Sequence, residues 1–300
     1  MALTVLMVTT EWPSIQYPHR VPFLVRQVEL LRNSGLDVDI FHFEGRRNVF
    51  NYLKAVSGFH KKFRSKRYDV IHAQWGQSAF PLLFTSVPVI VSFRGSDIYG
   101  STLDNGGYSF FGKALAFFSR QIVSRKATAL ILVSERMRDL LPSSVIAKTT
   151  IIPSGIDLTR FRPMDKVRCR AELGLPLEGK LVLFGSNPGR PEKRYGLAES
   201  AVRLVSGKMR CEMVVTGNIP HALMAKYINA VDVVLLTSTH EGSPNIVKEA
   251  LACNTPVVSV PVGDVPDRLA GLSGCVVSGD APVELAHSLE SVLSNTVPFE

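Results

Sequence analysis

Short runs of β-branched and other apolar residues alternate with segments of helix length along all 300 residues of the chain. This alternation is typical of α/β folds, in which helices cover both faces of a parallel sheet. The first half contains predicted strands at residues 3–9, 38–43, 70–74, 89–93 and 129–133. The second half contains predicted strands at residues 181–185, 213–216, 233–237, 257–260 and 275–277. We therefore expect an α/β protein with two parallel sheets.

The length of the chain suits two domains of about 150 residues each. Between the two series of strands lies the segment TTIIPSGIDLTRFRP, residues 149–163, where a short strand is followed by Pro153, Gly155 and Pro163. Prolines and a glycine at this spacing indicate a connector between domains. We predict Rossmann-like domains at residues 1–160 and 161–300, facing a central cleft. Ligands bind at the carboxyl ends of the strands in such sheets.

The apolar runs and the cysteines indicate in which cellular compartment the protein is located. No apolar run approaches the roughly 20 residues that cross a bilayer. The first residues, MALTVLMVTTEWP, lack the basic start of a secretion signal and are predicted to form a buried strand. The four cysteines are far apart and form no CxxC pair. Buried free thiols are therefore expected, and a cytoplasmic location is predicted, with peripheral attachment to the inner face of the membrane as an extension of that prediction.

Basic residues are concentrated in the first half. Residues 1–150 carry 19 Lys/Arg and 10 Asp/Glu, whereas residues 151–300 carry 15 and 16. The densest stretch, residues 46–67, interleaves cations with apolar residues, and Leu53, Val56 and Phe63 are predicted to share one helical face. One interpretation is a docking face for an anionic membrane surface or a lipid-linked acceptor. The other is an ordinary solvated helix packed on the sheet. Nucleic acid is not expected, because no known reader motif is present.

The segment after the strand at residues 233–237 contains the most informative pattern, THEGSPNIVKEALACNTPVVS. Ser243 is predicted as an N-cap and Pro244 as the first helical residue, with the helix ending near Asn254. The N-terminus of this helix is a candidate diphosphate site. Glu249 lies about 7 Å along the axis from the helix start, which suits a ribose, and Glu241 would face the sugar. Alternatively, Glu241 is a loop charge and Glu249 belongs to a solvated helix face.

The string EGSPNIVKEA, with Glu241 and Glu249 spaced as Glu-x7-Glu, resembles the signature of the family 4 retaining glycosyltransferases, which have the GT-B fold. The resemblance implies that Glu249 binds the ribose of a nucleotide sugar and that Glu241 contacts the sugar. The expected donor-binding residues are Glu249, Gly242, Ser243, Pro244, Asn245, Ile246, Gly185 and Arg194.

The function implied by the resemblance is transfer of a hexosyl or N-acetylhexosaminyl group from a nucleotide diphosphate donor. A UDP-sugar is favoured as donor, and the acceptor is a glycan, a lipid-linked molecule or another compound, as in polysaccharide or glycoconjugate synthesis. Neither a cofactor nor a metal is expected. The alternatives are a catalytically idle nucleotide-sugar-binding partner subunit and, less favoured, a sugar-nucleotide epimerase of the same fold.

The loop after the strand at residues 181–185 contains clustered cations. A fixed cation beside the departing diphosphate stabilises the transition state more than the ground state. By the resemblance, Lys193 and Arg190 have this role, and Arg194 could substitute for either of them. The alternative is a solvated basic loop.

Two strands of the first domain end in polar, glycine-containing loops, YDVIHAQWG and VSFRGSDIYG. They resemble the loops that line the acceptor side in the family. The candidate acceptor-side residues are His19, Arg20, His72, Arg94 and Asp97. Many relatives have a histidine where this chain has Arg94, so no general-base role passes to that position. The loop at residues 11–20 lacks the paired glycines of many relatives, and His72 could equally be a core histidine.

Two further sequence features differ from the pattern of the family: an Asp-x-Asp string and the end of the chain. Asp37 and Asp39 spell the Asp-x-Asp of a metal site, but Val38 and Ile40 alternate with them as in a half-buried strand, so a strand is predicted. Relatives usually continue past the last helix into a helix that crosses back onto the first domain, whereas this chain ends at VPFE. We expect the second domain to lack that closing helix.

Overall fold

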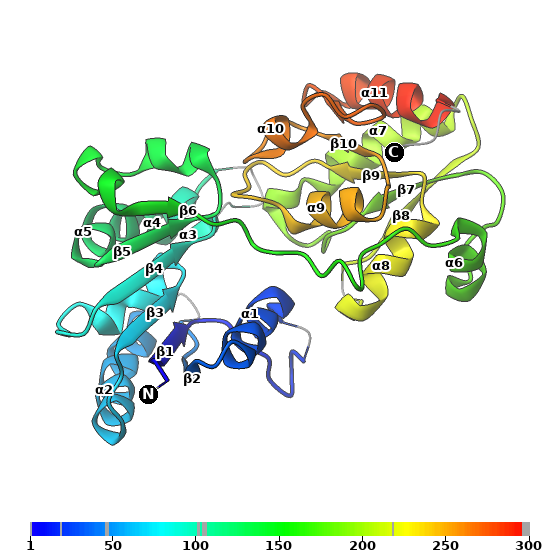
Figure 1. The fold of residues 1–300 in the computed structure, drawn as a ribbon. Coiled ribbons are helices and arrows are strands. Elements are labelled where there is room, and N and C mark those ends of the chain that lie inside the picture. The colour runs from blue at the N-terminus through cyan, green and yellow to red at the C-terminus, as the bar shows by residue number, and fades with distance from the viewer. Residues whose placement is uncertain are drawn as a thin grey trace. The chain divides into compact units, whose positions relative to one another are not determined.

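The computed structural model describes residues 2–18, 20–45, 48–100, 103, 107–217 and 219–295. The chain divides into two compact units (Figure 1). Unit 1 comprises Met1–Thr102 and Gly107–Ser154, and unit 2 comprises Leu103–Gly106 and Gly155–Glu300. The division at residues 154 and 155 falls inside the segment 149–163, where the prolines and the glycine interrupt regular structure.

Unit 1 is built on a parallel sheet of six strands in the order β2-β1-β3-β4-β5-β6. The strands are β1 (Thr4–Thr9), β2 (Asp37–His42), β3 (Val70–Gln74), β4 (Val89–Phe93), β5 (Ala129–Leu132) and β6 (Thr149–Ile151). The longer helices are α1 (Pro22–Asn33), α2 (Val49–Ser65) and α4 (Phe110–Phe118). Shorter turns are α3 (Ser96–Tyr99), α5 (Ser124–Lys126), a π-helix at Ser119–Val123 and 3-10 helices at Gly76–Leu82, Glu135–Leu140 and Ser143–Lys148.

Helix α2 packs on the sheet through a face that is rich in aromatic residues. Tyr52, Ala55 and Phe59 are buried, and the ring of Phe63 stacks 5.4 Å from that of Phe59. The side chain of Leu53 is instead 53% exposed. Leu53, Val56 and Phe63 do lie on one helix, but this face is only partly covered, because Phe63 packs on Phe59 while Leu53 stays exposed. Residues 46 and 47 of the basic stretch lie outside the described residues.

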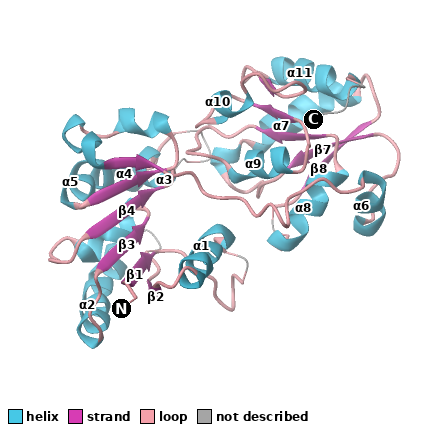
Figure 2. Cartoon of the chain, viewed as in Figure 1, coloured by secondary structure: helices cyan, strands magenta, loops and turns pink. Residues whose placement is uncertain are grey.

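Unit 2 is built on a parallel sheet of five strands in the order β11-β10-β9-β7-β8 (Figure 2). The strands are β7 (Lys180–Phe184), β8 (Cys211–Val215), β9 (Val233–Leu236), β10 (Val257–Ser259) and β11 (Val276–Val277). The helices are α6 (Lys166–Leu173), α7 (Tyr195–Ser206), α8 (His221–Ala230), α9 (Asn245–Ala252), α10 (Val265–Leu269) and α11 (Pro282–Ser294), with a 3-10 turn at Pro191–Lys193. Helix α7 packs beside α11, and α8 packs beside α6 and α9.

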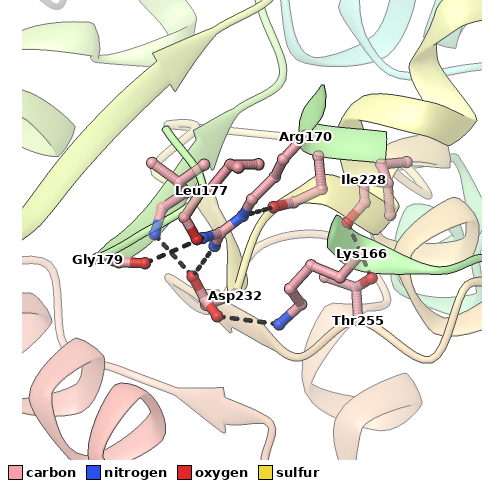
Figure 3. Close-up of polar contacts among 9 residues, drawn as sticks. Lys166, Arg170, Leu177, Gly179, Ile228, Asp232 and Thr255 are labelled. Atoms are coloured by element: carbon pink, nitrogen blue, oxygen red, sulfur yellow. Dashed lines mark hydrogen bonds and ion pairs between the residues drawn. The ribbon is translucent and has the colours of Figure 1, made fainter. Parts of the chain in front are cut away.

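A buried ion pair attaches α6 to the sheet of unit 2 (Figure 3). Arg170 is 4% exposed, and its guanidinium donates to the carboxylate of Asp232 at 2.7 Å and to the carbonyl oxygens of Leu177 and Gly179 at 2.9 and 3.1 Å. Lys166 donates to the other oxygen of Asp232 at 2.9 Å. Since a buried charge is costly unless it is paired, these contacts fix the start of β9 against α6.

The four cysteines are free; three of them, Cys169, Cys211 and Cys253, are buried as predicted, and Cys275 is half-buried. Burial raises the pKa of the Cys253 thiol to about 12 and that of Cys211 to about 11, so both stay protonated at neutral pH. Among the helices that the structure describes, none is long and apolar enough to cross a membrane.

Candidate functional site

The segments after β7 and β9 bring the predicted donor residues to one edge of the unit 2 sheet. The chain passes from β7 outward to β8 and from β9 outward to β10 in the opposite direction, while β7 and β9 are neighbours. Strand order therefore reverses between β7 and β9. In open α/β sheets this switch point is where ligands bind, beyond the carboxyl ends of the strands.

Lys193, in the loop after β7, and Glu241, in the loop after β9, form an ion pair. Their side chains are only 14% and 17% exposed, and the hydroxyl of Ser238 donates to the same carboxylate oxygen at 2.8 Å. The hydroxyl of Thr237 donates to the carbonyl of Lys193 at 2.8 Å, which ties the two loops together. The structure thus brings together two of the three residues predicted to act in catalysis.

Glu249 is not on a solvated helix face, so that alternative is wrong. The residue is 5% exposed in the middle of α9, and its Oε1 lies 2.9 Å from Nε2 of His221. His221 is the first residue of α8 and was not predicted. The one available sequence signal was a histidine directly after Pro220, between the predicted strands at residues 213–216 and 233–237.

The N-terminus of α9 differs by one residue from the prediction. The helix begins at Asn245 with Pro244 as N-cap, and no side chain caps its first turn. Ser243 therefore lies one residue before the cap, and its hydroxyl lies 3.5 Å from a guanidinium nitrogen of Arg268. Amides at the start of a helix that no side chain satisfies are suited to an anion.

Two glycines allow the loops around α9 to approach closely. A Cβ at Gly185, directly after β7, would lie 2.8 Å from the side chain of Ile246. Gly263 has a φ of +51°, and a Cβ there would lie 2.4 Å from the carbonyl oxygen of Gly242. Gly263 needs glycine, because both its φ and the backbone contact exclude a side chain, whereas a side chain at Gly185 would require Ile246 to shift. The predicted residues Gly185, Gly242 and Ile246 therefore shape the site through packing and backbone approach.

Arg190 and Arg194 have other contacts in the same loop. Arg190 is 58% exposed and pairs with Glu192. Arg194 has a left-handed backbone conformation with φ 49°, and it donates to the carbonyl of Thr237 at 2.6 Å and to Asp280 at 3.0 Å. Arg194 thus braces the loop after β7 against the loop after β9, and neither arginine joins the Lys193–Glu241 pair.

In unit 1 the predicted acceptor-side residues form an internal network. The guanidinium of Arg94 donates to Gln74 at 2.6 and 2.9 Å, to Ser154 at 2.9 Å and to Gln27 at 3.0 Å. Asp97 is 2% exposed and accepts backbone N–H groups of Gly76, Arg94 and Gly95. Burial lowers the pKa of Arg94 to about 10 and raises the pKa of Asp97.

His72 is buried between Ser92, 2.8 Å away, and the amide of Gln74, 3.2 Å away. Burial, with a smaller contribution from Arg94, lowers the pKa of His72 to about 4. The core-histidine interpretation agrees with this environment. The guanidinium of Arg20 lies over the ring of Tyr17 at 4.7 Å, and His19 lies outside the described residues.

The Asp-x-Asp pair does not form a metal site in the described structure. Asp37 and Asp39 both pair with Lys66, at 2.7 and 3.2 Å, and Tyr68 donates to Asp39 at 2.9 Å. Over the described part of the chain, no group of three or more His, Cys, Asp or Glu side chains is arranged to hold a metal ion.

Comparison with protein families matches both halves of the chain. Residues 19–155 match the model of the "Glycosyl transferase 4-like domain", and residues 166–295 match that of "Glycosyl transferases group 1". TuaC of Bacillus subtilis, a glycosyltransferase named for teichuronic acid biosynthesis, is 25% identical over 88% of this chain and 82% of its own length. A D-inositol 3-phosphate glycosyltransferase of Segniliparus rotundus is 32% identical over 49% of this chain, which matches only 39% of that enzyme.

Solved structures of glycosyltransferases share the fold. Sucrose-phosphate synthase from Thermosynechococcus elongatus superposes with a TM-score of 0.81 at 17% identity, over 98% of this chain and 90% of that one. HepE of Anabaena, solved with UDP and glucose, gives a TM-score of 0.69 at 14% identity, over 100% and 92% of the two chains. With both halves matched by glycosyltransferase domain models, the chain is a glycosyltransferase of the group 1 type and has the GT-B fold.

Proposed function

We propose that the chain is a retaining glycosyltransferase that takes a sugar from a nucleotide diphosphate donor, with a UDP-sugar favoured. One observation carries the proposal: Lys193, Glu241 and the uncapped N-terminus of α9 converge at the switch point of the unit 2 sheet, with Glu249 buried in the same helix. A cation, a carboxylate, free helix amides and a second carboxylate are the groups that a diphosphate, a sugar and a ribose require.

Each group has a proposed role in donor binding. The amides of Ser243, Asn245 and Ile246 and the ammonium of Lys193 bind the diphosphate, because both present positive charge. Glu249, about 6 Å along the helix from Asn245, accepts hydrogen bonds from the ribose hydroxyls. Gly185 and Gly263 keep the loops close enough for these groups to act on one ligand.

The proposed reaction breaks the bond between the anomeric carbon and the phosphate oxygen, and the electron pair leaves with the diphosphate. Lys193 stabilises the charge that develops there, which a preorganised cation does most strongly in the transition state. The acceptor oxygen then bonds to the anomeric carbon on the face that the diphosphate left. Its proton passes to the departing phosphate oxygen, and Glu241 stabilises the positive charge on the sugar.

The acceptor is proposed from the relatives. TuaC is named for the synthesis of a cell-wall polysaccharide, so we propose a growing glycan or a lipid-linked precursor as acceptor. HepE was solved with UDP and glucose, which favours UDP as the nucleotide and a hexose as the transferred sugar. Because Lys193 and α9 supply positive charge, we propose that no metal is needed; activity with and without EDTA tests this, and the anomeric configuration of the product tests retention.

Calorimetric binding of UDP, GDP and ADP to the full chain tests the donor site. We expect one nucleotide to bind in the micromolar range and Lys193→Ala and Glu249→Gln each to weaken it at least tenfold, about 1.4 kcal/mol. Lys208→Ala is the matched control, because Lys208 pairs with Glu290 on the surface of the same unit. Equal affinity in all four proteins, or no binding of any nucleotide, would rule out the proposed donor site.

We also propose that α2 contacts an anionic membrane surface. Its exposed side carries Phe50 and Leu53 with Lys54, Lys61 and Arg64, a combination that suits the boundary between lipid headgroups and acyl chains. Each cation near such a surface contributes about 1 kcal/mol. Sedimentation with vesicles containing anionic lipid should pull down the chain, and with neutral vesicles it should not. Equal binding to both would contradict the proposal.

A further inference from the structure

His221 and Glu249 come from different helices and meet at the candidate donor site. Nε2 of His221, at the start of α8, lies 2.9 Å from Oε1 of Glu249 in α9. The Glu249 side chain is 7% exposed, and that of His221 is 29% exposed. A carboxylate this deeply buried needs a hydrogen-bond donor, and His221 provides one across 28 residues of sequence.

The surroundings of the imidazole assign its proton to Nε2. An ionised carboxylate only accepts hydrogen bonds, so the ring nitrogen that faces Oε1 must donate. Nδ1 of His221 is buried and has no hydrogen-bond partner among the described residues. A proton on Nδ1 in place of Nε2 would leave a buried donor unpaired and two acceptors facing each other. The Nε2–H tautomer avoids both.

The orientation of the imidazole ring is also fixed by packing against Phe161. Phe161, which is 2% exposed, packs its ring 5.5 Å from the imidazole at an interplanar angle of 58°. The segment after Phe161 is fastened to α8 through Asn229, which accepts from the backbone of Met164 at 2.8 Å and donates to the carbonyl of Arg162 at 3.1 Å. The packing therefore fixes the direction in which the imidazole donates its hydrogen bond.

We propose that His221 is a positioning residue that fixes the carboxylate of Glu249 for binding the donor ribose. The inference rests on the proposed function, in which Glu249 binds that ribose. His221 binds Oε1 and sets the plane of the carboxylate, and Oε2 is the second acceptor oxygen of the same group. A ribose hydroxyl donates to Oε2, and a carboxylate that can rotate binds that hydroxyl less well because it must first be ordered.

The proposal is tested by pairing changes in the protein with changes in the ligand. Affinity is measured for whichever of UDP, GDP and ADP binds most tightly, and for its 2′-deoxy and 3′-deoxy forms. The proteins are the wild-type chain, His221→Leu, His221→Gln and His221→Asn. The glutamine amide can reach the position of Nε2, whereas the shorter asparagine amide cannot, so these two variants separate the hydrogen bond from side-chain polarity.

We expect the wild-type chain to bind at least one deoxy form tenfold more weakly than the ribonucleotide. His221→Leu and His221→Asn should bind the ribonucleotide at least tenfold more weakly and bind its deoxy forms within about twofold of it. His221→Gln should keep the wild-type discrimination within about threefold. In turnover assays we expect the KM for the donor to rise more than kcat falls.

The outcomes separate this proposal from the one on which it rests. If His221→Leu and His221→Asn discriminate between ribose and deoxyribose as the wild type does, the role of His221 is wrong and the donor site stands. If the wild type itself does not discriminate, the ribose role of Glu249 fails and this inference fails with it. If no nucleotide binds, both proposals are overturned. Circular dichroism identifies a variant that has not folded, and the asparagine and glutamine variants then decide the matter.

Discussion

At the scale of single residues, the Lys193–Glu241 ion pair holds two opposite charges in a largely buried position. Each side chain is less than one-fifth exposed, so each needs the other when no ligand is bound. In the proposed reaction, the diphosphate would replace Glu241 as the partner of Lys193, and the sugar hydroxyls would donate to Glu241. By that proposal the ion pair is exchanged for contacts with the donor.

Lys193→Ala should lower kcat by about 100- to 1,000-fold, the usual cost of removing one group that stabilises a developing anion. Lys193→Arg should recover only part of the loss, because a planar guanidinium presents its donors in another geometry. Initial rates at saturating donor measure the effect, with Lys208→Ala as control. A kcat within threefold of the wild-type value in Lys193→Ala would show that the cation is not part of the catalytic machinery.

The buried His72 should make unit 1 less stable in mild acid. Its pKa is about 4 in the folded chain and about 6.5 when unfolded, so between these values the unfolded chain binds more protons. The stability associated with the neutral ring is complete above pH 6.5 and is lost as the pH falls towards 4, by about 3 kcal/mol in total. Urea unfolding at pH 7 and pH 5 should show a smaller pH effect for His72→Gln than for wild type. Equal pH effects in the two proteins would contradict the assignment.

Local sequence predicted the two glutamates but not their partners. Glu241 and Glu249 belong to one strand, loop and helix, and the spacing within such a unit follows from helix geometry. Their partners come from elsewhere: Lys193 lies 48 residues before Glu241, and His221 lies 28 residues before Glu249. Lys193 was found through the resemblance to a family. His221 could not be found, because spacing does not reveal which loops of a sheet meet.

At the scale of elements, α6 depends on one buried ion pair for its attachment to the sheet. Arg170 of α6 and Asp232 before β9 are 5% and 14% exposed in their side chains (Figure 3). The guanidinium also satisfies backbone carbonyls of the segment between α6 and β7. Removal of the arginine would take its donors from these carbonyls, whereas the carboxylate of Asp232 would keep Lys166 and the backbone N–H of Leu181.

Arg170→Met should destabilise unit 2 by about 1–3 kcal/mol, the cost of leaving buried acceptors unsatisfied, because Lys166 still pairs with Asp232. Lys166→Met is the matched control, because Lys166 binds the same carboxylate from a half-exposed position and should cost less than about 1 kcal/mol. Urea unfolding followed by circular dichroism measures both. Similar losses in the two variants would show that burial of the pair is not what stabilises α6.

The strands were predicted well and the helix faces less well. All ten predicted strands are present with ends within two residues, because runs buried on both faces are recognisable by composition alone. Helix α2 has apolar residues on more than one side, and only the sheet decides that Phe59 and Phe63 pack inward while Leu53 stays exposed. The N-cap of α9 is Pro244 in place of the predicted Ser243, and the hydroxyl of Ser243 lies 3.5 Å from Arg268, which is 25 residues away in sequence.

At the scale of the whole molecule, each core belongs to one unit. The clusters around Leu6 and Met7 are formed by residues of unit 1, and the cluster around Leu183 is formed by residues of unit 2. The two tryptophans, Trp12 and Trp75, both lie in unit 1. Tryptophan fluorescence therefore reports the unfolding of unit 1 only, whereas circular dichroism reports both units.

Because the candidate donor residues lie in unit 2, nucleotide binding should stabilise that unit selectively. At a nucleotide concentration of 100 times Kd, the unfolding free energy should rise by about 2.7 kcal/mol. We expect the shift in the circular dichroism transition of unit 2, with a much smaller shift in tryptophan fluorescence. Glu249→Gln should reduce the shift at the same concentration, since its Kd is higher. A shift confined to the fluorescence signal would place the nucleotide in unit 1, and equal shifts in both signals would mean that the two cores unfold as one.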